Sequence, residues 1–163
     1  MGMSEHKATI SWKNSSDDFP SGRYSREHTW TFDGGLSVSA SASPSAVRPP
    51  MSNPAAVDPE EAFVASVSSC HMLTFVYLAW RKGFQPTSYE DQAVGHLSPN
   101  ENKVPWISRI TLRPRVTYQG ERHPTPDEEA HLHHEAHLQC FIAQSVKTAI
   151  EVVASQATPP YGF

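Results

Sequence analysis

The sequence predicts an α+β protein, and three observations lead to this fold class. The first third of the chain alternates apolar and polar residues with the period of two that is typical of strands. Two segments carry helix-start signals, one before residue 60 and one before residue 127. Strand-like segments lie between and after them, so the expected order is strands, helix, strands, helix and strand.

The N-terminal third is expected to form strands and a hairpin. Apolar and polar residues alternate over 8–12, and again over 27–41 on both sides of the turn sequence Asp33-Gly34-Gly35, which predicts a hairpin. The proline-rich stretch 44–59 follows and is expected to be a loop.

The first helix is expected to begin after Asp58 and to end near Arg81. Asp58 is a capping residue, Pro59 suits the first turn, and Gly83 suits the position after the last turn. Residues 62–80 include no Lys, Arg, Asp or Glu, and a helix without charge on any side is expected to be buried. The predicted architecture is therefore antiparallel strands around a long buried central helix.

Strands are expected near 88–98, 106–119 and 148–154, with Pro114 indicating an edge or a bulge. The second helix begins at Thr125-Pro126-Asp127-Glu128, which is a capping-box pattern. On this helix, one face is expected to carry Leu132, Ala136 and Cys140. The tail from Thr158 is expected to be frayed.

Length and composition exclude several classes of protein. The 163 residues suit a single domain, 1–163, and the formal net charge of -4 comes without a Lys/Arg cluster that would bind nucleic acid. We expect no membrane span and no secretory signal, because no apolar run approaches the ~20 residues that a span needs and the N-terminus is polar. Two cysteines do not make a disulfide scaffold, so a cytoplasmic location is expected.

Cys70 and Cys140 raise the main functional question. Each lies in a helix-like setting, and the two are far apart in the sequence. Two such cysteines can be inert core thiols, or they can be one reactive thiol and the partner that resolves it.

The surroundings of Cys70 favour the reactive interpretation. Residues 58–73, Asp-Pro-Glu-Glu-Ala-Phe-Val-Ala-Ser-Val-Ser-Ser-Cys-His-Met-Leu, resemble the OsmC/Ohr family of thiol peroxidases. The family has Asn-Pro-Glu-Glu/Gln, a helix of small residues and then a cysteine, and Glu60 and Cys70 keep its spacing. Cys140 lies close to where the family has its second cysteine. Phe141 and Ala143 replace the usual proline and serine, which indicates a divergent branch.

The resemblance implies an intertwined homodimer that reduces organic hydroperoxides without a metal or an organic cofactor. Cys70 would attack the peroxide, Cys140 would form a disulfide with it, and an external dithiol would restore both thiols. The family also uses an arginine from the N-terminal strands, held by the helix glutamate, to stabilise the thiolate. Arg26 is the candidate, Arg23 is second, and Glu60 is the glutamate.

Helix geometry limits where Glu60 can act. Ten residues of helix span about 15 Å, so Glu60 cannot contact Cys70 of its own helix. Either the arginine bridges the gap or the site forms at a homodimer interface. The apolar residues near the two cysteines favour an organic hydroperoxide over hydrogen peroxide; they are Met72, Phe75, Phe141 and Ile142.

Two alternatives stay open. The chain could be a non-enzymatic binding module with structural cysteines, or it could hold a metal through Cys140, His133 and His137, of which the two histidines are four residues apart. For the cluster of His131, His133, His134 and His137, however, a solvated helix face is the favoured interpretation. His71 is expected to pack or to form a hydrogen bond rather than to act in catalysis.

Overall fold

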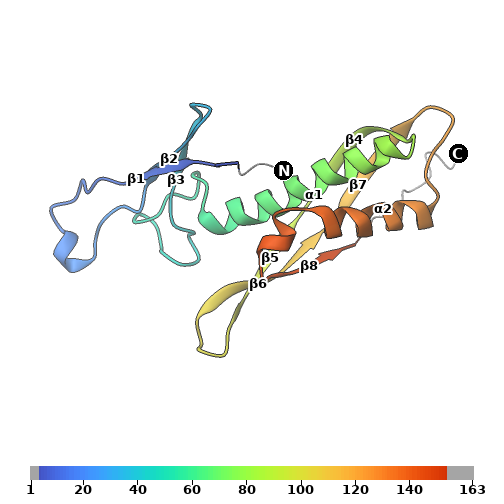
Figure 1. Cartoon of the computed structure of the whole chain (residues 1–163). Coiled ribbons are helices and arrows are strands. Elements are labelled where there is room, and N and C mark those ends of the chain that lie inside the picture. The colour runs from blue at the N-terminus through green and yellow to red at the C-terminus, as the bar shows by residue number, and fades with distance from the viewer. Residues whose placement is uncertain (1–3, 154–163) are drawn as a thin grey trace, which may run out of the picture. The chain divides into compact units, whose positions relative to one another are not determined.

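The computed structural model describes residues 4–153, which divide into two compact units between Ala62 and Phe63 (Figure 1). The tail from Thr158 lies outside the described residues. A single domain over 1–163 stays a prediction, and each unit is described by itself.

The first unit contains a three-stranded antiparallel sheet in the order β1-β2-β3. Its strands are β1 (Ala8–Ser11), β2 (His28–Phe32) and β3 (Ser37–Ala40), with a 3-10 helix, η1 (Phe19–Ser21), between the first two. The β2–β3 pair is the hairpin expected over 27–41, and Gly35 adopts a φ of 87° in its turn. The proline-rich loop returns to the sheet through a bridge between Ala40 and Val57.

Helix α1 (Pro59–Arg81) has the bounds that the sequence predicts. Asp58 Oδ1 accepts a hydrogen bond from the Glu61 amide at 2.7 Å, and Glu61 Oε2 accepts one from the Asp58 amide at 3.2 Å. This reciprocal pair satisfies two amides of the helix start. Beyond the other end, Gly83 has a φ of 81°, the left-handed conformation that stops a helix.

Burial of α1 differs from the expectation for an uncharged helix. Its buried stripe, at intervals of four residues, consists of Val67, His71, Phe75 and Ala79. A second stripe stays exposed and is called here the outer stripe; it consists of Leu73, Val76, Tyr77 and Trp80. The absence of charged residues predicted that every side of the helix would be buried. In the single chain, however, one side of α1 is buried and another stays exposed.

Helix α1 also corrects the expectation that no apolar run could span a membrane. Its 23 residues include an 18-residue window of mean hydropathy 1.6, which meets that requirement by length and composition alone. The central helix of a folded domain meets the same requirement.

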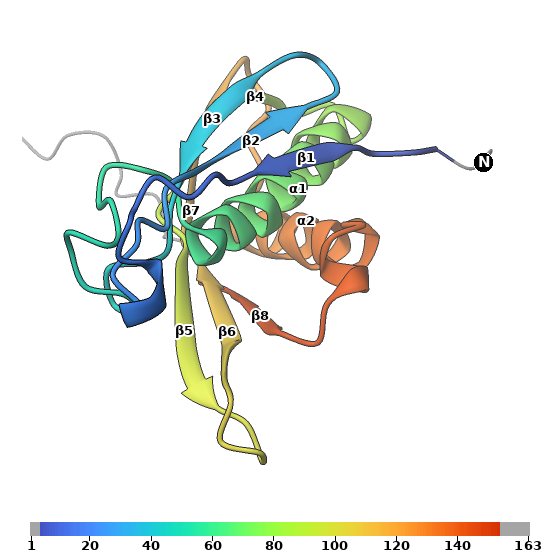
Figure 2. The same ribbon diagram turned by 90° about the vertical axis from the view of Figure 1, so that its left-hand side faces the viewer.

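The strands of the second unit form two sheets. One pairs β4 (Gln85–Asp91) with β7 (Pro114–Gln119), and the other has the order β5-β6-β8, formed by β5 (Val94–Pro99), β6 (Pro105–Leu112) and β8 (Ala149–Val152) (Figure 2). The final strand is confirmed, but it runs parallel to β6 rather than antiparallel.

Each of the two long strands expected near 88–98 and 106–119 is broken in the middle. The breaks fall after Asp91 and at Arg113, just before Pro114. Asp91 Oδ1 accepts a hydrogen bond from the Arg113 amide at 2.6 Å, and its other oxygen accepts one from the Ser68 hydroxyl of α1. Asp91 therefore ties both breaks to the central helix.

Helix α2 (Pro126–Gln139) begins with the expected capping box between Thr125 and Glu128. It lies beside α1 in Figure 1 and shares a core with it and with β7. This core contains Phe75, Ala79, Phe84, Val116, Leu132 and Ala136. A second cluster packs α1 on β6 through Val67, Ile110 and Leu112.

Candidate functional site

Cys70 and Cys140 lie together in the second unit, and both are free thiols. Cys70 sits in the middle of α1 and is partly exposed, whereas Cys140 is fully buried. Helix α2 ends at Gln139, and Cys140 caps its C-terminus in an extended conformation. The sequence predicted Cys140 on the helix itself, so its position differs from the prediction by one residue.

The turn that follows α2 provides a backbone amide for each sulfur. The Ile142 amide donates to Cys70 Sγ at 3.5 Å, and the Ala143 amide donates to Cys140 Sγ at 3.4 Å. The chain turns here into the short 3-10 helix η2 (Ala143–Ser145), and the Gln144 amide of this helix donates to the Cys140 carbonyl at 3.1 Å. Amide donors stabilise a sulfur that carries negative charge.

The surroundings of Cys140 make its thiol a weaker acid than an ordinary cysteine. Burial, together with a hydrogen bond to the Cys70 side chain, raises the pKa of Cys140 to about 11. Because the thiolate is the reactive form of cysteine, Cys140 stays a protonated and poorly nucleophilic thiol near neutral pH. Its proton can be shared with the sulfur of Cys70, which is the solvent-accessible member of the pair.

The apolar residues expected near the thiols separate into two groups. Phe141 and Ile142 belong to the turn beside the sulfurs, and Phe141 is 71% exposed. Phe75 is instead fully buried in the core between α1 and α2, where it stacks on His133.

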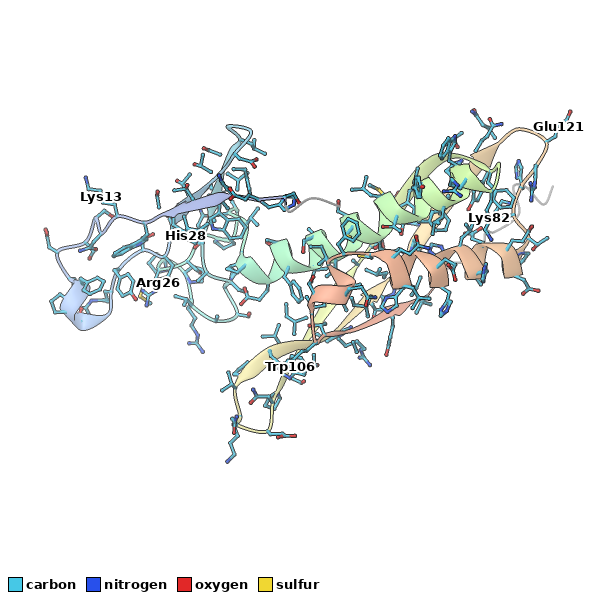
Figure 3. All side chains as sticks on the ribbon, in the orientation of Figure 1. Lys13, Arg26, His28, Lys82, Trp106 and Glu121 are labelled. Carbon is cyan, nitrogen blue, oxygen red and sulfur yellow. The ribbon has the colours of Figure 1, made fainter. Side chains whose placement is uncertain are left out.

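Arg26 and Glu60 belong to the first unit. The Arg26 guanidinium donates to the carbonyls of Gly22 and Tyr24 and lies 3.6 Å from the centre of the Tyr24 ring (Figure 3). Arg26 also lines an apolar cavity of about 470 Å³ with the aromatic residues of that unit, which include Trp12 and Phe19.

The expected pairing of Glu60 with Arg26 is not made in the part of the chain that the structure describes. Glu60 Oε2 is buried there without a hydrogen-bond partner. Arg23, the second candidate, forms an exposed ion pair with Asp18.

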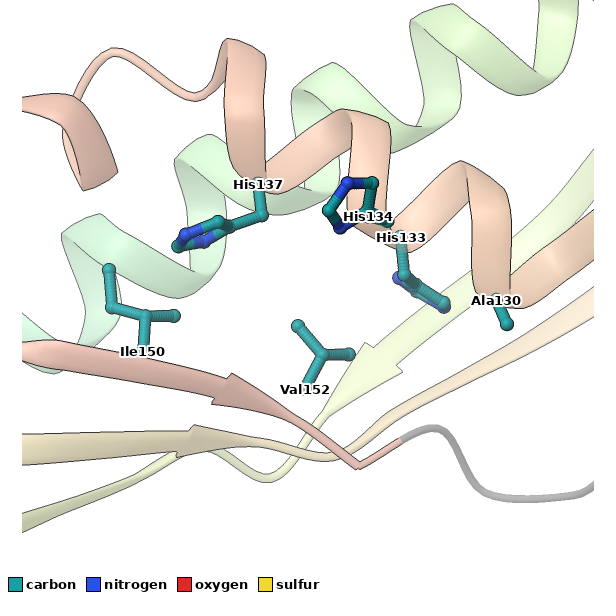
Figure 4. A pocket seen from close by; sticks show the side chains of 6 residues that line it. All are labelled: Ala130, His133, His134, His137, Ile150 and Val152. Carbon is teal, nitrogen blue, oxygen red and sulfur yellow. The ribbon is translucent and has the colours of Figure 1, made fainter.

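The histidines of α2 do not behave as one cluster. His131 and His134 are exposed, whereas His133 is 3% exposed and bonds to the equally buried His71 of α1, with 3.0 Å between His71 Nε2 and His133 Nδ1. His133, His134 and His137 also line a cavity of about 270 Å³, together with Ile150 and Val152 of β8 (Figure 4). The sequence expectation of a packing or hydrogen-bonding role for His71 agrees with this contact.

The alternative metal site finds no support in this geometry. Within residues 4–153, no three His, Cys, Asp or Glu side chains are arranged to hold a metal ion. His133 uses its Nδ1 atom for the bond to His71 rather than for a metal ion.

Sequence reasoning missed the two amide donors and the bond between the histidines. The amide donors depend on how the chain turns after α2, for which the sequence carries no local signal. The histidine bond had one usable signal, since His71 falls in register with Val67, Phe75 and Ala79 on the buried stripe.

Comparisons with known proteins agree with this fold. An OsmC-like protein of unknown function from Vibrio cholerae is 46% identical, with a TM-score of 0.91 over 94% of this chain and 100% of the other. An organic hydroperoxide resistance protein OsmC from Legionella pneumophila is 15% identical, with a TM-score of 0.69 over 96% and 100%. The organic hydroperoxide resistance protein OhrB of Bacillus subtilis is also 15% identical, with a TM-score of 0.65 over 93% and 98%.

No curated protein matches the sequence. The family model described as OsmC-like protein matches residues 52–155, which include both cysteines and most of the second unit. The chain therefore belongs to the OsmC-like protein family.

Proposed function

We propose that the protein is a thiol-dependent peroxidase that reduces organic hydroperoxides with Cys70 and Cys140. The observation that carries the proposal is the paired thiols: a partly exposed Cys70 lies against a buried Cys140, and each sulfur accepts a backbone amide. Organic hydroperoxide resistance proteins among the solved structures with this fold add support.

The proposed reaction has three steps. The Cys70 thiolate attacks the terminal peroxide oxygen, the O–O bond breaks, and the alkoxide takes a proton to leave as an alcohol. The resulting Cys70 sulfenic acid then condenses with the Cys140 thiol, so that a disulfide forms and water leaves. An external dithiol reduces this disulfide and is itself oxidised to a disulfide.

The roles of the two cysteines follow from exposure and acidity. Cys140 is fully buried and its pKa is raised to about 11, which makes it a poor nucleophile toward peroxide but a suitable partner for a sulfenic acid beside it. The exposed apolar ring of Phe141, in the turn beside the sulfurs, favours an organic group on the peroxide.

Arg26 and Glu60 enter the proposal on the basis of the sequence resemblance. Arg26 would stabilise the thiolate and the charge that develops on oxygen, and Glu60 would orient Arg26. A buried carboxylate oxygen without a partner, such as Glu60 Oε2, is costly unless a cation or a donor reaches it, which supports this pairing in the assembled protein.

The proposed assembly is a homodimer in the cytoplasm. Four large apolar side chains on the outer stripe of α1, from Leu73 to Trp80, are exposed in the single chain. A contiguous exposed apolar surface of this kind is typical of a protein interface. A second copy of the chain would cover it.

Titration of free thiols after reaction with cumene hydroperoxide tests the proposal. We expect the wild type to lose both thiols, Cys70→Ser to consume no peroxide, and Cys140→Ser to consume about one equivalent and then stop, because its sulfenic acid has no partner. Two thiols that persist in excess peroxide would favour a binding module with structural cysteines. An active Cys70→Ser variant would reverse the roles.

A further inference from the structure

The bond between His71 and His133 is a polar contact across the apolar interface of α1 and α2. His71 is 1% exposed and His133 is 3% exposed, and their rings are nearly coplanar, with 9° between the planes. Around them lie apolar core residues, including Phe75, whose ring stacks on His133 at 4.2 Å. A polar contact in such surroundings has one favourable geometry, whereas apolar side chains can slide past one another.

The bond between the two rings requires a defined protonation state. One imidazole donates its proton and the other accepts it, so at least the accepting ring must be neutral, and the bond is lost when both rings are protonated. Burial lowers the pKa of His71 to about 4 and that of His133 to about 3, which keeps both neutral near pH 7. The other ring nitrogen of His133, Nε2, has no hydrogen-bond partner within the described residues, and Glu129 Oε1 is 4.0 Å away. Among hydrogen bonds within the described residues, the one to His71 is therefore what orients this ring, in addition to the stacking of Phe75.

The bond joins the two helices that position the cysteines. His71 follows Cys70 directly, and His133 precedes Cys140 by two turns of the same helix. Disulfide formation tolerates only a narrow range of distance and dihedral angle between the two residues. A small shift of α2 along α1 would therefore move the two sulfurs out of the distance and orientation that a disulfide needs.

We propose that His71 and His133 are positioning residues, whose hydrogen bond sets the register of α2 against α1 so that Cys140 can form a disulfide with Cys70. The inference rests on the proposed function only in requiring that these two cysteines form a disulfide. The bond acts on the closing step and leaves the attack of Cys70 on the peroxide unchanged, because neither imidazole bonds to a sulfur within the described residues.

Amide side chains provide matched variants for this test. The asparagine amide lies near the position of an imidazole Nδ1, and the glutamine amide reaches the position of Nε2. His133→Asn and His71→Gln therefore retain a polar atom where the bond is made. His133→Phe and His71→Asn break the bond, the first with the aromatic stacking kept and the second with a polar residue kept. His134→Asn, at an exposed position on the same helix, is the control.

The measurement is the equilibrium between the Cys70–Cys140 disulfide and dithiothreitol in a redox buffer, which involves no peroxide. Two protein thiols and oxidised dithiothreitol exchange with the protein disulfide and reduced dithiothreitol. We expect the breaking variants to lower this equilibrium constant at least ~10-fold, which is about 30 mV for the two-electron couple. The retaining variants and His134→Asn should stay near wild type, and the rate of the first oxidation by cumene hydroperoxide should not change.

The competing results are distinct. Breaking variants that keep the wild-type equilibrium constant would overturn the positioning role, as would retaining variants that lose as much as breaking ones. A uniform loss of thermal stability without a change in the equilibrium constant would mean a structural role alone. If the wild type forms the disulfide with oxidised dithiothreitol but not with peroxide, the proposed peroxidase function is wrong and the positioning role is unaffected. No disulfide in either reagent would overturn both.

Discussion

At the scale of single residues, the two cysteines are alike in sequence setting and different in chemistry. Cys70 is partly exposed, while Cys140 is buried and its pKa is raised by burial and by its bond to Cys70. The difference arises from position: the middle of a half-covered helix for one thiol, and the packed end of a helix for the other. The same residue type therefore serves two roles in the proposed mechanism.

Arg26→Ala is predicted to slow the reaction of Cys70 with cumene hydroperoxide at neutral pH by at least ~10-fold, about 1.4 kcal/mol in the barrier. A cation near the reacting atoms stabilises both the thiolate and the charge that develops on oxygen. Stopped-flow measurement of the first oxidation gives the rate. Arg23→Ala is the matched control, since Arg23 is exposed and paired with Asp18. Equal rates in wild type and Arg26→Ala would remove Arg26 from the mechanism.

At the scale of elements, the helix ends were predictable because their signals are local. Both α1 and α2 begin with a capping box, between Asp58 and Glu61 and between Thr125 and Glu128. The residues of each box lie within one helical turn of each other, so the pattern of residue types is sufficient to predict where the helix begins. The breaks in the long strands depend on Asp91, whose partners Ser68 and Arg113 are far away in the sequence.

The two buried histidines predict that acid destabilises the packing of α1 on α2. Burial lowers the pKa of His71 from 6.5 to about 4 and that of His133 to about 3, whereas the unfolded chain takes up these protons near pH 6.5. The unfolded state therefore binds more protons in this window, and stability is lost as the pH falls from about 6.5 to about 4. For His71 the free energy of unfolding falls by an amount of order 3 kcal/mol over this pH range.

Urea unfolding at a series of pH values measures this loss. The double variant His71→Gln/His133→Asn has no imidazole to protonate, so its stability should fall less than that of the wild type between pH 6.5 and pH 4. Carboxylates titrate in both proteins and cancel in the comparison. His134→Asn is the control for an exposed histidine and should follow the wild type. Parallel curves for wild type and double variant would contradict the prediction.

At the scale of the whole molecule, the outer stripe of α1 predicts self-association. Trp80 is 66% exposed at one end of this stripe, and Trp80→Glu would place a charge in the proposed dimer interface. We expect the variant to be monomeric where the wild type is a dimer, because an unpaired charge is costly to bury. Light scattering coupled to size-exclusion chromatography gives the mass. Val104→Glu, at a similarly exposed apolar residue in the β5–β6 turn, should remain dimeric. A dimeric Trp80→Glu would place the interface elsewhere.

The sequence by itself determined the α+β class, the helix bounds, the β2–β3 hairpin, the final strand and the two cysteines as the candidate reactive pair. These features depend on residues near one another in the chain, such as caps, turns and alternation, or on a motif of fixed spacing around Cys70. The resemblance to the OsmC/Ohr family came from the same short motif, and the family model and the Vibrio cholerae structure bear it out.

Only the tertiary structure decided which side of α1 is buried, how the strands divide into two sheets, and that β8 runs parallel to β6. It also decided that one turn after α2 supplies an amide to each sulfur and that His71 meets His133. Each of these depends on contacts between residues distant in the sequence, where many pairings satisfy the same local preferences. The packing of the whole core selects one of them, and no short pattern of residue types encodes that choice.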